Sequence, residues 1–256
     1  PRHSSSAASD VYKRQLASDR AAYRLADQFD QEVLGYLSGF KQSALHGTPN
    51  AANTTASGDK AVSSAGSNEL LTSMQVDAAD FNSGSSGNSI VVVPRAGGDS
   101  LNTTTAKASP LSVIARMSRK LDQQFVDSQG RWLVIDPVFA ELLKDEDSRL
   151  MDSDFGGSGL QNGLVFNNIH GFKVYMSNNL PAVGNGPTGA TSTGSAHYGV
   201  ICAGHSSAVA SAEQINKTET YRDPDSFADI VRGMHLYGRK ILRPEALTRA
   251  LYVSSI

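Results

Sequence analysis

Hydrophobic residues in the first part of the chain recur every three or four positions, which is the spacing of one face of an α-helix. The pattern predicts a long amphipathic helix over residues 16–44, and Gly47 and Pro49 are expected to end it. An ordinary packing helix accounts for such a face without any further role. The apolar face would consist of Ala22, Leu25, Ala26, Phe29, Val33, Leu34, Leu37 and Phe40.

Residues 46–109 have a different character, because serine, threonine, asparagine, glycine and alanine dominate and Phe81 is the only aromatic residue. A stretch of this composition is expected to bury little surface. The apolar run at 90–93 is its one expected strand. We therefore expect a polar, flexible insertion or loop.

The middle of the chain carries clear start signals for helices. Ser109 followed by Pro110 predicts a helix to about residue 127, and Asp136 followed by Pro137 predicts a second helix over 137–144. Two strands are expected, one buried at 131–135 and one half-buried at 172–177. The first helix is expected to turn Leu111, Ile114, Ala115, Ser118, Leu121 and Phe125 to one side.

The last third is rich in expected strands, at 198–203, 215–220 and 248–253, with a short helical stretch of small residues at 206–212. Residues 227–242 fit a helix by spacing, but Gly233, Gly238 and the aromatic content favour a long bent strand. Helices and strands interleave without strict alternation. The expected class is α+β or mixed α/β.

Composition excludes several functions. The 256 residues contain 23 lysines and arginines against 25 aspartates and glutamates, so no global positive field exists to bind nucleic acid. The single Cys202 cannot form an internal disulfide, which favours folding in a reducing compartment. No apolar run approaches the roughly 20 residues needed to span a bilayer, and no membrane partner is expected.

Candidate chemistry is sparse. Cys202 and His205 could form a nucleophile and base, but a buried packing cysteine is the more common case. The glycine cluster at 156–163 follows a helix and an acidic run and lacks the lysine of a phosphate-binding loop. The histidines are scattered, and the acidic run at 145–147 lacks the spacing of a calcium loop. We expect no metal, no cofactor and no enzymatic activity.

The chain begins with Pro1, and residues 1–15 show neither periodicity nor apolar character. We interpret this segment as a non-native or disordered leader and the chain as lacking a natural amino-terminal part.

Several short segments, taken in their order along the chain, resemble the major capsid proteins of tailed phages with the Hong Kong 97-type fold. The resemblance covers about residues 20–253, and the ordered set is more specific than any single piece. The segments are the helix around Asp30, Leu121-Asp122, Gly130-Arg131-Trp132-Leu133-Val134 with Pro137, Asn162-Gly163, His170-Gly171-Phe172-Lys173-Val174-Tyr175, Ser177-Asn178, Gln214-Ile215, Asp229-Ile230-Val231-Arg232, Tyr237-Gly238-Arg239-Lys240 and Arg243-Pro244-Glu245-Ala246.

The resemblance implies a division of the chain. A spine helix at 16–45 and strands within 213–256 would form a peripheral domain, and 110–212 would form an axial domain made of a sheet flanked by helices. The insertion at 46–109 would lie on the shell surface. The amino-terminal arm and extended hairpin loop of such proteins would precede residue 16.

The resemblance also implies roles for individual residues. Arg131 and Trp132 would hold the axial domain together, and Tyr237, Arg239 and Arg243 would make contacts within the peripheral domain or between subunits. The remaining structural or assembly candidates are Pro137, Gly171, Asn178 and Pro244.

The function implied is self-assembly into the hexamers and pentamers of an icosahedral shell around double-stranded DNA. Scaffold and portal proteins would be partners, the DNA would be touched only weakly and non-specifically, and the protein would assemble in the host cytoplasm and reside in the virion capsid. Three alternatives stay open at this point: an encapsulin-type nanocompartment shell, a hydrolase that uses Cys202, and an extracellular adhesin.

Overall fold

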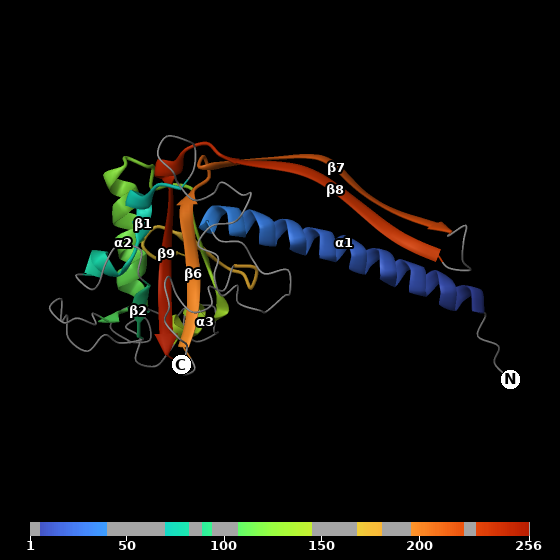
Figure 1. The fold of residues 1–256 in the computed structure, drawn as a ribbon, viewed down its shortest axis with the longest axis horizontal. Helices are drawn as coiled ribbons and strands as arrows, with labels where there is room; N and C mark the ends of the chain where they lie inside the picture. Colours follow the sequence, from blue (N-terminus) through green and yellow to red (C-terminus); the bar gives the residue numbers. More distant parts are fainter. Residues whose placement is uncertain are drawn as a thin grey trace.

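The computed structural model describes residues 6–39, 70–81, 89–93, 107–144, 168–180, 196–222 and 229–255. They form a body built on a seven-stranded sheet and an arm that projects from it (Figure 1). The arm consists of helix α1 (Ser6–Ser38) and the antiparallel hairpin β7 (Val209–Arg222) and β8 (Asp229–Ile241). These elements are mixed helix and sheet, as the α+β expectation requires.

The sheet of the body is mixed, in the order β3-β2-β9-β6-β4-β5. Strand β6 is antiparallel to both of its neighbours, β9 and β4, while β4 and β5 run parallel. Strands β1 and β2 both pair with β9 in parallel, one beside its first residues and one beside its later residues. The strands are β1 (Gln75–Val76), β2 (Ile90–Val92), β3 (Lys107–Ala108), β4 (Arg131–Ile135), β5 (Lys173–Met176), β6 (Ala196–His205) and β9 (Leu247–Ser255).

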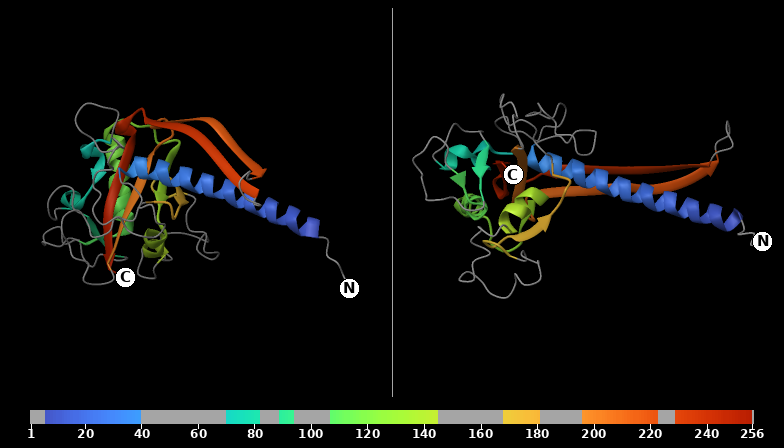
Figure 2. Two further views of the ribbon diagram at one scale, coloured as in Figure 1. Left: turned by 45° about the vertical axis from the view of Figure 1, so that its right-hand side comes forward. Right: turned by 90° about the horizontal axis from the view of Figure 1, so that it is seen from below.

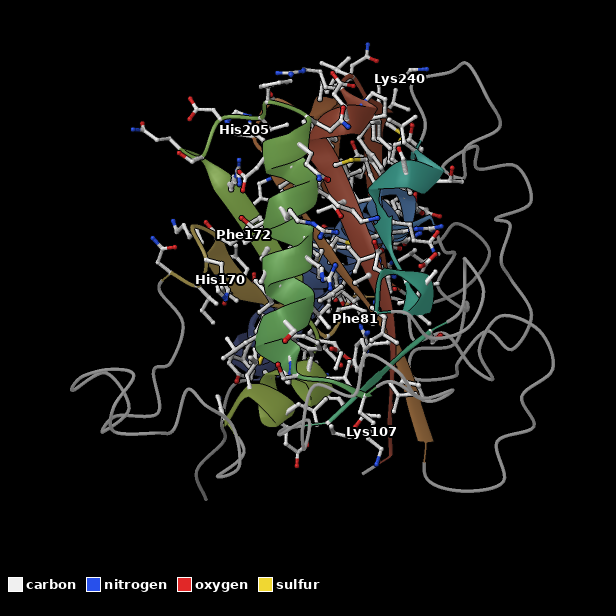
Figure 3. The ribbon with its side chains drawn as sticks, turned by 90° about the vertical axis from the view of Figure 1, so that its left-hand side faces the viewer. Phe81, Lys107, His170, Phe172, His205 and Lys240 are labelled. Atoms are coloured by element: carbon white, nitrogen blue, oxygen red, sulfur yellow. The ribbon has the colours of Figure 1, made fainter. Side chains whose placement is uncertain are left out.

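Helix α2 (Pro110–Gln123) and the end of α1 lie on opposite sides of this sheet (Figures 1 and 3). Helix α3 (Pro137–Lys144) contacts α2 and β6. The core between them is apolar and closed, with Ile114, Leu133, Phe139 and Tyr252 fully buried. The arm leaves this core and extends well beyond it, as the two further views in Figure 2 also show.

Helix α2 starts and packs for local reasons. The Ser109 side chain accepts a hydrogen bond from the Ser112 N–H, and Pro110 occupies the first helical position. The buried face contains Val113, Ile114, Met117 and Leu121. The helix ends at Gln123, however, and the expected inward position of Phe125 is wrong because this side chain is 96% exposed.

The transition from β4 to α3 agrees with the strand and the capped helix that the sequence predicted. Strand β4 alternates between buried and half-buried residues, and the Asp136 carboxylate accepts a hydrogen bond from the Phe139 N–H as a helix cap. The second carboxylate oxygen of Asp136 accepts a 2.5 Å hydrogen bond from the buried Tyr252 hydroxyl of β9. The cap of α3 is thereby tied to the central strand of the sheet.

The expectation that residues 46–109 bury little surface is wrong for the residues that the structure describes there. They include the 3-10 turns Thr72–Met74 and Ala78–Phe81 and the strands β1, β2 and β3. Strands β1 and β2 pair with β9, and β3 pairs with β2. The expected strand at 90–93 corresponds to β2. The residues of this segment that join the hydrophobic core are Leu70, Met74, Val76, Phe81, Ile90, Val92 and Ala108.

Helix α1 differs from its expected bounds at both ends. It begins at Ser6, inside the segment interpreted as a leader, and it ends at Ser38 rather than near residue 44. Gly39 follows with φ +75°, and its N–H donates to the Tyr36 carbonyl. A left-handed glycine is a common helix stop, so the chain stops α1 before Gly47 and Pro49.

The final strands differ from expectation in one element. The expected helical stretch at 206–212 is wrong, because Ser206 and Ser207 form a turn and β7 begins at Val209. Pairing with β8 over the full hairpin overrides the helix preference of these small residues. Residues 229–241 form the long strand that the glycines favoured, and β9 then returns to the middle of the body sheet.

Candidate assembly surfaces

The arm is held together by an aromatic cluster between α1 and the inner face of the hairpin. The ring of Phe29 on α1 lies 4.7 Å from Tyr237 in an edge-on arrangement and 5.3 Å from His235. Residues two apart on a strand share one face, so His235, Tyr237 and Arg239 all point toward the helix. Tilted and edge-on aromatic pairs of this kind are favourable beyond their buried area.

Glu32 connects the same two elements through polar contacts. Its carboxylate accepts hydrogen bonds from the Tyr237 hydroxyl and, at 2.9 Å, from the Arg239 guanidinium. Partial burial acts to raise the pKa of Glu32, but these donors together outweigh it and hold the pKa below its ordinary value. Burial and the Glu32 contact raise the pKa of Tyr237 to about 12. Glu32 is therefore ionised, and Tyr237 remains a donor, at neutral pH.

The helix and the hairpin lie close together at Gly233. A Cβ at this position would lie 2.4 Å from the Leu25 Cδ1 atom of α1. At Gly238, on the same strand, a Cβ would meet nothing within 4 Å. Only the first of these two glycines is required by the packing.

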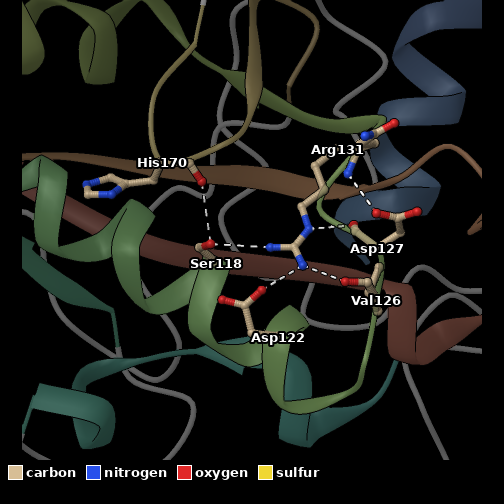
Figure 4. A network of polar contacts seen from close by, with 7 residues as sticks. Ser118, Asp122, Val126, Asp127, Arg131 and His170 are labelled. Carbon is tan, nitrogen blue, oxygen red and sulfur yellow. Dashed lines mark hydrogen bonds and ion pairs between the residues drawn. The ribbon is translucent and has the colours of Figure 1, made fainter.

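Arg131 is the polar centre of the body (Figure 4). Its buried guanidinium donates to the Val126 and Asp127 carbonyls at 2.6 and 2.8 Å and to the Asp122 carboxylate at 2.7 Å. A further bond of 3.3 Å reaches the Ser118 hydroxyl of α2. A single side chain at the start of β4 therefore fixes the end of α2 and the segment that follows it.

The other body candidates have simpler positions. Trp132 is half-buried against the core, next to Gly204, and Pro137 is exposed at the first position of α3. Gly171 and His170 both have positive φ, +82° and +49°, in a two-residue turn between the paired residues Ile169 and Phe172. Such a turn requires left-handed residues, which is the physical reason for Gly171.

Asn178 is exposed, whereas its neighbour Asn179 forms hydrogen bonds to helix α1. The Asn179 amide donates at 2.8 Å to Asp27 of α1 and accepts at 3.5 Å from Gln31. This contact ties the turn after β5 to the arm. Asn179 lay beside a candidate in the sequence, but nothing in the sequence distinguished the two amides.

Arg243 and Pro244 lie where the hairpin rejoins the body. Arg243 is half-exposed and donates to Glu245 at 3.1 Å and to the Ser207 hydroxyl at 3.4 Å. Pro244 begins the 3-10 turn Pro244–Ala246 that leads into β9. The two residues shape a corner of the surface.

The sequence did not single out Arg249, which is the joint between the arm and the body. Its buried guanidinium donates to the Ser38 carbonyl at the end of α1 and to the Gln75 side chain, at 2.6 and 2.8 Å. Burial lowers the pKa of Arg249 to about 10, so it remains charged at neutral pH. An arginine in a strand is usually expected to be exposed, so the local sequence around Arg249 did not indicate this role.

The structure argues against the nucleophile pair. Cys202 is completely buried in β6, and burial raises the pKa of its thiol to about 12. Residues three apart on a strand point to opposite faces, and His205 contacts Ser207 at 2.8 Å. A reactive cysteine requires a lowered pKa and access to substrate, and Cys202 has neither.

Within the parts of the chain that the structure describes, no group of three or more histidine, cysteine, aspartate or glutamate side chains could hold a metal ion. Among those same residues, no helix is both long and apolar enough to cross a membrane.

The outer faces of the arm carry exposed apolar residues. Tyr12, Leu16 and Tyr23 are spaced by four and seven positions and share one face of α1. Tyr221, Met234 and Leu236 lie on the face of the hairpin that points away from the helix. Large exposed apolar side chains concentrated on a slender projection are a feature of proteins that assemble through it.

Taken together, a projecting arm and a body whose polar groups are used for internal bracing define the class of a structural assembly subunit. A family model described as a phage capsid protein matches residues 14–250, and the chain belongs to this family. It is a structural protein rather than an enzyme.

Solved structures share the fold. A structure from Mycobacterium phage Che8 is 23% identical with a TM-score of 0.55, and the match covers 91% of this chain and 61% of that one. The capsid structure of the cyanophage P-SCSP1u is 18% identical with a TM-score of 0.54, covering 94% of this chain and 66% of that one. The chain thus spans less than two thirds of their lengths. A comparison with curated proteins gave no match.

These findings confirm the capsid resemblance and the mixed fold. They give no support to a nanocompartment shell, a cysteine hydrolase or an adhesin.

Proposed function

We propose that this chain is the major capsid subunit of a tailed bacteriophage, with a Hong Kong 97-type fold, and that its copies form the hexamers and pentamers of an icosahedral shell around double-stranded DNA. In this proposal the arm is the peripheral domain and the body is the axial domain. The division expected from the sequence is thereby revised, because β9, which lies within 213–256, and strands β1, β2 and β3 from 46–109 belong to the sheet of the body. Family membership supports this proposal, together with the likeness of the fold to the cyanophage capsid structure.

The observation that carries the proposal is the arm. One helix and a two-stranded hairpin form a small core, and elements of this size are only marginally stable alone. Six large apolar side chains on its outer faces are nevertheless between 39% and 71% exposed. Neighbouring copies in a closed lattice would cover them, and the many weak contacts of a shell add up through valency.

The other partners follow from this role. Scaffold and portal proteins would guide assembly in the cytoplasm of the host bacterium, and the finished subunit would reside in the virion. The chain has a net charge of −2, so contact with packaged DNA would be weak and non-specific.

The test is expression of the complete gene in bacteria, with and without its neighbouring genes, followed by sedimentation and electron microscopy. Closed shells of uniform size, with portal and terminase genes adjacent, are the expected result. A protein that stays monomeric in both settings contradicts the proposal.

The candidate residues of the arm and corner have their own test. The double variant Arg239→Ala, Arg243→Ala is expected to assemble poorly, because it removes the Glu32 ion pair and the cation at the corner. Shells like those of the wild type would show that these residues are not needed for assembly.

A further inference from the structure

Helix α2 ends with a common pattern of backbone hydrogen bonds, but the residue at its left-handed position is unusual. The Phe125 N–H donates to the Asp122 carbonyl at 3.0 Å, and the Val126 N–H donates to the Leu121 carbonyl at 3.2 Å. Phe125 has φ +56°. This is a Schellman motif, in which the left-handed position is usually glycine because a side chain there is strained.

Neither the backbone nor the core of this chain explains a phenylalanine at this position. Glycine would adopt the same conformation without strain, and the Phe125 ring is almost wholly exposed. The next residue, Val126, supplies the apolar contact of the motif and is buried. A strained, bulky and unpacked residue indicates a role outside the chain.

Residues 124–127, the segment that presents Phe125, are tied to the body by hydrogen bonds. The Arg131 guanidinium holds the carbonyls of the two following residues, Val126 and Asp127, from inside the body (Figure 4). Because these bonds already hold the backbone, a partner that covers Phe125 has mainly its side chain left to order.

A complementary surface lies at the same end of the body. His205 approaches Gly130 at the end of the Phe125 segment, and Ser207 bonds to Arg243. Beyond this turn the corner carries exposed Leu242 and Lys240, and Figure 3 shows His205 and Lys240 at this end. The Phe125 segment carries exposed acidic side chains at Asp122, which is paired with Arg131, and at Asp127. The corner carries two cations, Lys240 and Arg243, against the single carboxylate of Glu245.

We infer that Phe125 is a docking knob for a second copy of this chain, inserting against Leu242 and the side chains of Lys240 and Arg243. Cations pack favourably on an aromatic face, and Asp127 would oppose the same cations. The knob and its acceptor are different patches of one surface, so the contact is head-to-tail, and within a hexamer or pentamer of the proposed shell it would close into a ring. This inference rests on the proposed function and specifies one contact within it.

The first test compares three variants of the full-length protein. Phe125→Gly is expected to leave the melting temperature unchanged or raised, because strain is relieved, while the concentration needed for half-assembly rises at least tenfold by sedimentation velocity. Phe125→Leu, which keeps an apolar knob, is expected to retain most of the assembly. Gln124→Ala, an exposed neighbour on the same segment, is the matched control and is expected to behave like the wild type.

The second test identifies the acceptor. The double variant Phe125→Cys, Leu242→Cys is expected to give a ladder of covalent oligomers on mild oxidation, ending at a closed ring. Each single variant is expected to give none, because buried Cys202 stays silent. No ladder from the double variant, or a dimer from Phe125→Cys alone, would overturn the head-to-tail pairing.

The outcomes separate the two proposals. If the wild type assembles and Phe125→Gly assembles equally well, the knob is wrong and the capsid function stands. If Phe125→Gly melts at a lower temperature, Phe125 has an internal role and the inference is wrong. If the wild type itself does not assemble, both proposals fail.

Discussion

The body and the arm of this protein use the same kinds of residue in opposite ways. In the body, a large apolar core is fully buried, and the guanidinium groups of Arg131 and Arg249 form hydrogen bonds inside the fold. Among the described residues of the body, the large apolar side chains that are exposed are Phe125, Tyr175, Met176 and Leu242. In the arm, aromatic and charged groups meet across one thin interface, and large apolar residues face outward. If the proposed function holds, the body is expected to be stable by itself, whereas the arm is expected to gain stability from neighbouring copies.

The substitution expected to have the largest effect is Arg131→Met, which tests whether the body is held together by its buried arginine. It leaves the Val126 and Asp127 carbonyls without their buried donor, and a loss of about 3 kcal/mol in the free energy of unfolding of the body is expected. Urea unfolding measures it. The exposed Arg119 on α2 supplies the control, Arg119→Ala, which is expected to change stability by less than about 0.5 kcal/mol. Equal effects of the two variants would show that Arg131 does not brace the body.

Arg249→Met tests the joint between the two regions. The Ser38 carbonyl and the Gln75 side-chain oxygen both lose the hydrogen bond from Arg249, and a loss of about 2 kcal/mol is therefore expected. Hydrogen exchange measures where the loss falls. Faster exchange in the last turns of α1 is expected, and exchange that changes only in the sheet would contradict the joint.

Gly233→Ala and Gly238→Ala form a matched pair within the arm. The first puts a methyl group against Leu25 and is expected to cost about 1 kcal/mol, because the flexible leucine can partly move aside. The second enters open space and should be neutral or slightly stabilising. Thermal unfolding followed at the arm aromatics measures both, and equal melting temperatures would mean that the helix and hairpin are not in close contact.

The smallest expected effect is the pH dependence of the arm. Because the folded-state pKa of Glu32 lies below its ordinary value of 4.5, its stabilising contribution is full above that pH and is lost as the pH falls through the folded-state pKa. Solvent screening keeps it well below about 1 kcal/mol. Tyrosine fluorescence between pH 6 and pH 3 should show the arm loosening before the body unfolds. Glu32→Gln should remove this dependence, and an unchanged profile would show that another group controls it.

Local signals predicted much of the fold. The serine, proline and aspartate caps around α2 and α3 and the strand from Arg131 to Ile135 agree with the structure, because each is set by residues within one turn or one strand. Phe125 was expected on the buried side of α2 but is exposed. The small residues at 206–212 were expected to form a helix, whereas pairing with β8 makes most of them part of strand β7. The contacts of Arg249 and Asn179 join residues far apart in the chain, so no local pattern could reveal them.

The sequence by itself determined the class of fold, the resemblance to capsid proteins and the absence of a strong overall charge, since periodicity, segment order and composition are local or additive properties. Only the tertiary structure decided which arginines are buried, how the polar segment near residues 70–108 contributes edge strands, and that Phe125 faces solvent. These depend on which distant segments meet, and that is settled by the packing of the whole chain.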